Sequence, residues 1–150
     1  MFAVGRAARF AAACLTGLCM TAVDASERFD VARAKQNYQL HCMGCHGEEG
    51  MGLEGHVPPI RLTLAPLLAT AAGREYVLRV PGIAQSSLTS HELADVLNWL
   101  LHNLSVASTA RVVAPLSPSE VARFRDRPWL DVQRARSLVA PAGMLSPGIP

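Results

Sequence analysis

The segment Cys42-Met43-Gly44-Cys45-His46 brings two thiols and an imidazole together within a few residues. C-x-x-C-H is the pattern to which a haem is attached covalently. The two intervening residues let both sulfurs reach the two vinyl groups along one edge of a porphyrin. The next residue then lies under the iron, where its imidazole can coordinate the metal. The motif therefore predicts one covalent haem c, attached at Cys42 and Cys45, with His46 as an axial iron ligand.

Three other structures can contain such a cysteine pair. A thioredoxin-like redox pair usually lies between a strand and a helix, and the sequence shows no strand pattern. Half of a zinc site needs further ligands, but the other two cysteines, Cys14 and Cys19, lie in a segment that we expect to be removed. A disulfide would close a poor loop and would leave His46 unexplained. These arguments favour the haem.

Residues 1–25 have the organisation of a secretory signal. Arg6 and Arg9 form its basic beginning, an uncharged and mostly apolar stretch follows, and Val23 and Ala25 are small residues in front of the expected cleavage point. The apolar stretch is short for a bilayer span, although a membrane anchor or a buried helix is the alternative. We expect cleavage after Ala25 and a periplasmic protein with no stable membrane span.

The composition is that of a globular domain without a nucleic-acid surface. The chain has 150 residues, of which 50% are hydrophobic and 17% are charged, and its net charge is +2. This length suits one domain, and the apolar content is too high for a disordered chain. No run of Lys and Arg is dense enough to bind phosphates, so we expect no nucleic-acid partner.

Apolar periodicity predicts an all-α protein. A first helix over residues 30–40 carries Val31, Ala34 and Tyr38 on one face, and a loop follows over residues 47–59. A short helix covers residues 73–80. Thr89-Ser90-His91-Glu92 is a capping box for a long amphipathic helix with an apolar stripe up to residue 104. After a linker over residues 105–115, Ser117-Pro118-Ser119-Glu120 is a second capping box. It starts a short helix from Pro118 to about Asp126, and another is expected from about Pro128 to Val139.

Over about residues 29–104 the chain resembles the small single-haem cytochrome c family. Tyr38 and Ala34 lie four and eight residues before the first cysteine of the motif, where the family keeps an aromatic and a small residue. Pro58 lies twelve residues after His46. The resemblance implies a cytochrome c-like fold of three to four core helices. It also implies that the Pro58 carbonyl orients the proximal imidazole.

We therefore expect three segments: a signal peptide over residues 1–25, a haem domain over 26–105 and a C-terminal extension over 106–150. The extension should hold two short helices and a Pro/Gly-rich tail. Its basic side chains are predicted to form a solvated surface, with a docking face for an acidic partner as the alternative. These residues are Arg123, Arg125, Arg127, Arg134 and Arg136.

The chain departs from the family at the sixth iron ligand. The family places a methionine in the loop before its last helix, but residues 81–88 contain neither Met nor His. Met144 in the tail is the methionine candidate, although the tail would have to fold back over the haem. An open or weakly occupied site near Gln85 is the interpretation that the sequence favours most. A histidine (His56, His91 or His102) is an alternative equal to Met144, and a ligand supplied by a partner is a further one; Met51 follows His46 too closely, on the proximal side.

The resemblance implies a one-electron carrier or the cytochrome subunit of a dehydrogenase. Its partners would be redox proteins such as a periplasmic dehydrogenase or a terminal oxidase. We do not expect an enzyme, because no acid, base or nucleophile constellation is visible in the sequence. The loop without methionine favours a different alternative, a haem protein that binds or senses a small gas at an open iron. Haem peroxidase chemistry is a weaker alternative, since no distal acid–base pair can be named.

Overall fold

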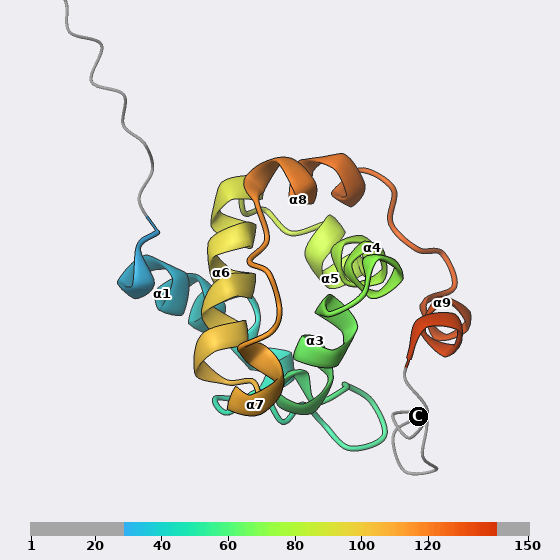
Figure 1. The fold of residues 1–150 in the computed structure, drawn as a ribbon, viewed down its shortest axis with the longest axis horizontal. Coiled ribbons are helices and arrows are strands. Elements are labelled where there is room, and N and C mark those ends of the chain that lie inside the picture. Colours follow the sequence, from blue (N-terminus) through green and yellow to red (C-terminus); the bar gives the residue numbers. More distant parts are fainter. Residues whose placement is uncertain (1–28, 141–150) are drawn as a thin grey trace, which may run out of the picture.

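The computed structural model describes residues 29–140, and these residues confirm the all-α prediction (Figure 1). Within them, an isolated bridge between Leu53 and Val57 is the only β-pairing. None of the described helices is long and apolar enough to cross a membrane. The predicted signal over residues 1–25 and the candidate Met144 lie outside the described residues. The helices are α1 (Val31–His41), α2 (Met43–His46), α3 (Ile60–Leu68), α4 (Ala71–Arg79), α5 (Pro81–Ala84), α6 (Ser90–Asn103), α7 (Ala107–Ala110), α8 (Pro118–Arg125) and α9 (Val132–Val139).

Helix α6 is the longest helix of the described part, and α1, α3, α7 and α8 pack against it. Its capping box is confirmed: the Thr89 hydroxyl accepts a hydrogen bond from the Glu92 amide, and the Glu92 carboxylate accepts one from the Thr89 amide. The predicted apolar stripe is buried along nearly the whole helix, which supplies a large share of the hydrophobic stabilisation. Its buried members are Leu93, Val96, Leu97, Leu100 and Leu101.

Helix α1 lies against α6, on the left of Figure 1. Asp30 caps it, because its carboxylate accepts hydrogen bonds from the amides of Ala32 and Arg33. Ala34 and Tyr38 are both buried, as the spacing predicted, whereas Val31 in the first turn is 53% exposed, so the buried face begins only at Ala34. The Tyr38 ring lies 5.5 Å from the ring of Trp99 on α6, so these aromatic side chains pack the two helices together.

Helix α3 follows directly on the predicted loop and was not expected from the sequence. A proline inside a helix removes a backbone donor and usually ends the helix, and Pro66 lies within α3. The Thr63 hydroxyl donates a hydrogen bond to the Pro59 carbonyl in its first turn. Leu64, Leu67 and Leu68 are buried in the core. Tertiary burial therefore offsets the poor local propensity of this segment.

The C-terminal extension differs from the prediction at two places. Residues 105–115 are not a plain linker, because they contain α7 and the buried side chain of Val113. The last helix begins at Val132, where Asp131 caps it, and not near Pro128. The preceding residues are held to α4 instead: the Trp129 amide donates to the Arg79 carbonyl.

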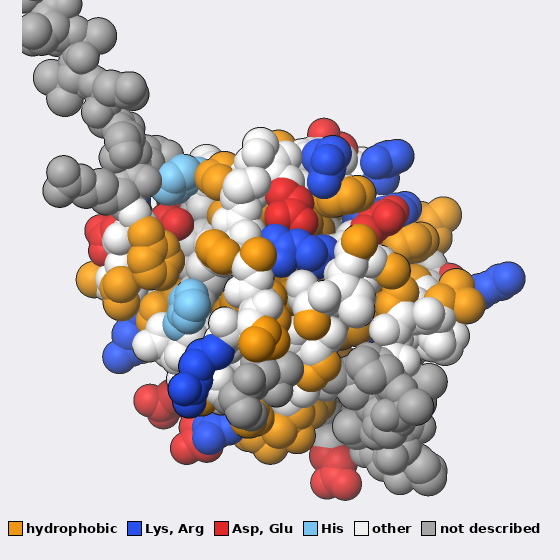
Figure 2. Space-filling view, in the orientation of Figure 1, with side chains coloured by type: hydrophobic (Ala, Val, Ile, Leu, Met, Phe, Trp, Pro, Cys, Tyr) orange, Lys and Arg blue, Asp and Glu red, His pale blue; other side chains and the backbone are white. Residues whose placement is uncertain are grey.

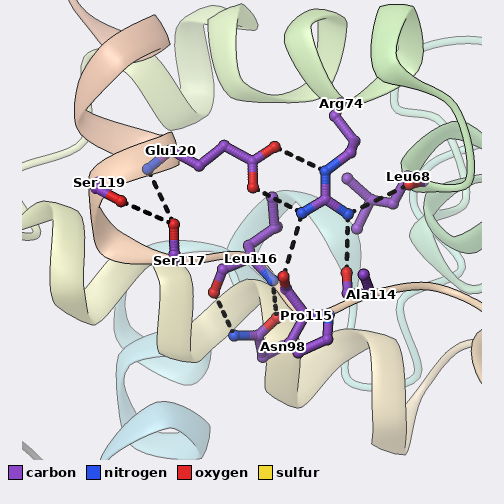
Figure 3. Close-up of polar contacts among 9 residues, drawn as sticks. All are labelled: Leu68, Arg74, Asn98, Ala114, Pro115, Leu116, Ser117, Ser119 and Glu120. Carbon is purple, nitrogen blue, oxygen red and sulfur yellow. Dashed lines mark hydrogen bonds and ion pairs between the residues drawn. The ribbon is translucent and has the colours of Figure 1, made fainter.

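A second predicted capping box, at the start of α8, is only half formed (Figure 3). The Ser117 hydroxyl accepts a hydrogen bond from the Glu120 amide. The Glu120 carboxylate does not return to the cap, because it accepts two hydrogen bonds of 2.7 Å from the Arg74 guanidinium on α4. Arg74 also donates to the carbonyls of Ala114 and Pro115. This ion pair joins α8 to α4.

Candidate haem site

The C-x-x-C-H segment occupies the sharp junction between α1 and α2. Cys42 ends α1 and begins α2, with φ −128° and ψ −37°. Its carbonyl accepts hydrogen bonds from the amides of Cys45 and His46 at 3.2 and 3.0 Å. This single tight turn holds both thiols and the imidazole close together, and all three side chains line one cavity.

The glycine-rich loop after the motif folds back onto it. The Tyr38 hydroxyl donates a hydrogen bond to the Gly47 carbonyl, and the Gly52 amide donates to the His46 carbonyl at 2.8 Å. Gly52 has φ +70°, and a Cβ at this position would lie 2.2 Å from the Val57 carbonyl oxygen. Only glycine fits such a close backbone approach. These contacts fix the backbone on both sides of His46.

The cavity has a volume of about 430 Å³ and is lined mainly by apolar side chains. Cofactor sites typically measure about 300–1,000 Å³ and have a few polar groups in an apolar wall. Most of the wall comes from α3, α4, α5 and α6. The apolar lining residues include Ile60, Leu64, Leu67, Val77, Val80, Ile83, Leu93, Val96, Leu97 and Leu100.

His46 presents a half-buried imidazole to this cavity. Burial lowers its pKa, and the Pro58 carbonyl acts in the opposite direction. The geometry toward Pro58 falls short of a full hydrogen bond, so the buried Nδ1 has no hydrogen-bond partner among the described residues. A neutral imidazole is the form that coordinates a metal. Pro58 itself also lines the cavity, as the sequence analysis places it beside this ring.

The Cys42 thiol does not have the surroundings of a reactive cysteine. Burial, together with the nearby Cys45, raises the pKa of the Cys42 thiol. Reactive cysteines have the opposite shift, because positive neighbours stabilise their thiolates. The described residues also contain no group of three or more His, Cys, Asp or Glu side chains that could hold a metal ion. The local chemistry therefore favours the haem over the thioredoxin-like and zinc alternatives.

Most of the candidate sixth ligands lie away from the cavity. Gln85 and Met51 are exposed and are not part of its wall, and the same is true of His102. His91 lies on α6 with its Nδ1 3.3 Å from a carboxylate oxygen of Asp95. His56 does line the cavity, in the same loop as Pro58. The segment before α6 contributes Pro81, Gly82, Ile83 and Ser86 to the wall.

Two arginines of the extension correct the prediction of a solvated basic surface. Arg125 on α8 donates hydrogen bonds of 2.7 and 2.6 Å to the carbonyls of Leu88 and Ser86. Arg136 on α9 is 5% exposed and lines the cavity together with Val132. The sequence holds no signal for either role, because the periodicity of a short helix does not show what packs on it. The other three basic residues, Arg123, Arg127 and Arg134, are exposed as predicted.

The donor set and the cavity fit a covalent haem. Two thiols and the imidazole of His46 line an apolar space, and the buried Arg136 adds a positive charge to its wall. Thiols for the vinyl groups and an imidazole for the iron are the groups by which a c-type haem is held.

Comparison with known proteins agrees with this assignment. No family model matches the chain, and no solved structure matches it. Two proteins from Thermus thermophilus, both named cytochrome c-552, are 29% identical to it over 102 residues. The match covers 56% of this chain and 78% and 69% of the two relatives. Over this part the chain is similar to a c-type cytochrome.

Proposed function

We propose that this protein is a periplasmic c-type cytochrome that carries one electron. Its single haem c is attached at Cys42 and Cys45, and His46 is the proximal ligand, oriented by the Pro58 carbonyl. One observation carries the proposal: both thiols and the imidazole of His46 line the same apolar cavity of about 430 Å³.

The protein's own residues provide a dry and rigid frame for electron transfer. A haem bound here supplies a one-electron ferric–ferrous couple. The apolar walls from α3, α4 and α6 exclude water from the ring. The hydrogen bonds from Tyr38 to Gly47 and from Gly52 to His46 hold the attachment segment in place. A fixed environment reduces the reorganisation that accompanies each electron transfer.

Electrons would enter and leave at the attachment edge. Gly44 and Cys45 are exposed, whereas Cys42 is half-buried. The thioether edge of the haem therefore reaches the surface between α1 and α2. A redox partner such as a periplasmic dehydrogenase or a terminal oxidase would dock over this edge. On the face shown in Figure 2, acidic and basic side chains are interspersed with apolar ones, so this face carries no field of one sign.

One observation favours a second function, the binding or sensing of a small gas. Among the described residues that line the cavity there is no methionine, and the segment before α6 presents Ile83 and Ser86 instead. An iron without a strong sixth ligand binds carbon monoxide or nitric oxide readily. This candidate uses the same haem attachment and differs only at the distal face.

The attachment is tested by extracting the protein with acidified organic solvent. Haem should stay with the wild-type chain and with Gly44→Ala, a matched control between the two cysteines whose added Cβ meets no atom within 4 Å. Cys42→Ala and Cys45→Ala should each retain at most one thioether. Release of all the haem from the wild-type protein into the solvent would overturn the proposal.

Absorption spectra separate the carrier from the gas-binding protein. A ferric spectrum with a thioether band, and no change when carbon monoxide is added to the ferrous protein, supports a carrier with a closed iron. Ready binding of carbon monoxide supports the second function.

A further inference from the structure

Arg136 is a buried charge without a counter-ion among the described residues. It is 5% exposed, and its Nη2 atom is buried with no hydrogen-bond partner. A buried guanidinium is costly unless an anion or several acceptors surround it. The described acidic side chains in ion pairs bind other partners: Glu120 is held by Arg74, and Glu75 is held by Arg79.

Arg136 lies in the cavity wall, and almost none of its side chain reaches the surface. Arg136 and Val132 are the residues of α9 that line it. Tyr76 of α4 lies on the same wall, and α9 packs against α4. Burial raises the pKa of Tyr76, whereas the nearby positive charge of Arg136 acts in the opposite direction. Tyr76 and Arg136 therefore lie near each other in the same wall of the cavity.

The position of α9 indicates which edge of a bound haem would lie nearest to it. Figure 1 shows α1 and α9 at opposite sides of the described part, with α3, α4 and α5 between them. The attachment cysteines follow α1, so they hold the vinyl edge on that side. In this porphyrin the two propionate carboxylates extend from the edge opposite the vinyl groups. The only anions of the cofactor thus point toward the side of α9.

We propose that Arg136 binds a haem propionate, so that α9 closes the propionate edge of the cavity. The inference rests on the proposed haem attachment. A guanidinium matches a carboxylate with two parallel hydrogen bonds, which makes arginine well suited to this contact. The pair satisfies the unpartnered Nη2 and neutralises both buried charges. The extension then has a defined role, because it supplies part of the haem site.

The test measures the midpoint potential of the holoprotein. Arg136→Gln should lower the potential, because loss of a buried positive charge near the iron favours the ferric state. Arg136→Lys keeps the charge and should restore most of the wild-type value. Arg134→Gln is the matched control: it removes the same charge from the exposed face of α9, where solvent screens it, and should shift the potential much less.

Two results would overturn the inference. The first is a potential in Arg136→Gln that equals that of Arg134→Gln, which would leave Arg136 with a packing role. The second is an unchanged potential with a large change in the cyanide dissociation constant, which would place Arg136 beside an iron-bound anion. Haem that is not attached at all is a different outcome, since it refutes the proposed function.

A measurement on the wild-type protein covers the case in which Arg136→Gln fails to mature. Infrared spectra of the holoprotein with 13C-labelled propionate carboxyls should show an ionised carboxylate from pH 8 down to pH 5, because the arginine lowers the propionate pKa. No carboxyl group of the described cavity wall would overlap this signal. Apart from the attachment residues and Arg136, its ionisable side chains are those of His41, His56 and Tyr76. Both propionates protonated at pH 5 would contradict the pairing.

Discussion

Ala34 is a buried residue on α1, the helix that packs against α6, and its small side chain permits close packing. It is 1% exposed, and the tilted ring pair of Tyr38 and Trp99 lies one helical turn further along α1. A methyl group is the largest side chain that such a buried contact accepts without moving the helices. Because the attachment cysteines follow α1 directly, any displacement of α1 also displaces the haem edge.

Ala34→Leu is therefore expected to destabilise the holoprotein by about 1–3 kcal/mol through overpacking. Thermal and urea denaturation, followed by circular dichroism, measure the loss. Ala32→Leu is the control, because Ala32 lies on the exposed face of the same helix and should change stability by less than about 0.5 kcal/mol. Equal melting temperatures for the two variants would show that Ala34 does not lie in a tight contact.

At the scale of elements, the extension is joined to the haem domain by buried polar contacts in addition to apolar packing. Arg74 of α4 holds Glu120 of α8, as Figure 3 shows. Arg79 of α4 stacks over the ring of Trp129, 3.6 Å from its centroid. Arg125 of α8 donates to two carbonyls in front of α6. Such contacts are directional, so they place α8 and α9 against the cavity wall in one arrangement.

The Arg74–Glu120 pair makes stability depend on pH. Its hydrogen bonds hold the pKa of Glu120 below the ordinary value of 4.5, so the stabilisation is present above that value and disappears as the pH falls through the folded-state pKa. Glu120→Gln should cost about 1.5–3 kcal/mol at pH 7, and its difference from the wild type should shrink below pH 4.5. Urea titrations at several pH values measure both effects.

Glu75→Gln is the matched control for that experiment. Glu75 lies on α4 next to Arg74 and pairs with Arg79 one turn later, with 39% of its side chain exposed. Exposed i,i+4 pairs contribute only about 0.3–0.5 kcal/mol. If Glu75→Gln loses as much free energy of unfolding as Glu120→Gln, the Arg74–Glu120 pair does not stabilise the protein more than the Glu75–Arg79 pair does.

Arg125 is expected to keep the segment before α6 closed over the cavity. Arg125→Gln removes the charged donor to the carbonyls of Ser86 and Leu88, so the backbone amides of residues 85–89 should exchange with deuterium faster. Arg127→Gln, which changes an exposed arginine just after α8, should leave them unchanged. Faster exchange in α1 as well would indicate global destabilisation and not a local opening.

At the scale of the whole molecule, the cavity wall draws on segments from almost the full described length. Its lining residues run from His41 in α1 to Arg136 in α9. The haem domain and the extension therefore share one site, although residues 29–104 already carry the resemblance to small cytochromes. Displacement of either the haem domain or the extension should therefore change the shape of the cavity.

Removal of residues 141–150 tests whether anything beyond α9 reaches the iron. Because residues 81–88 contain neither Met nor His, we expect an iron that is already open or weakly ligated. The shortened protein should then keep its absorption spectrum, midpoint potential and carbon monoxide binding. Spectroelectrochemistry of both proteins makes the comparison. A low-spin ferric spectrum that becomes high-spin only after the removal would identify Met144 as the sixth ligand.

The features that depend on short spacing could be predicted from the sequence. These features depend on residues that lie within about two helical turns of each other. They are the all-α class, the capping box of α6, the burial of Ala34 and Tyr38, and the tight C-x-x-C-H turn. Cys42, Cys45, His46 and Pro58 were also singled out in the sequence and line one cavity, whereas their roles toward a haem stay predictions. Cys42, Cys45 and His46 form one short motif, which can be recognised without knowledge of the tertiary structure.

The features that depend on distant contacts were decided by the tertiary structure. Helix α3 forms in spite of Pro66 because the core buries its leucines, and Trp129 is drawn to Arg79 so that α9 begins late. The contacts of the half-buried Arg125 and the burial of Arg136 depend on where α8 and α9 dock. A basic side chain on a short helix looks the same in sequence whether it faces water or a cavity, because only the packing of other elements determines its surroundings.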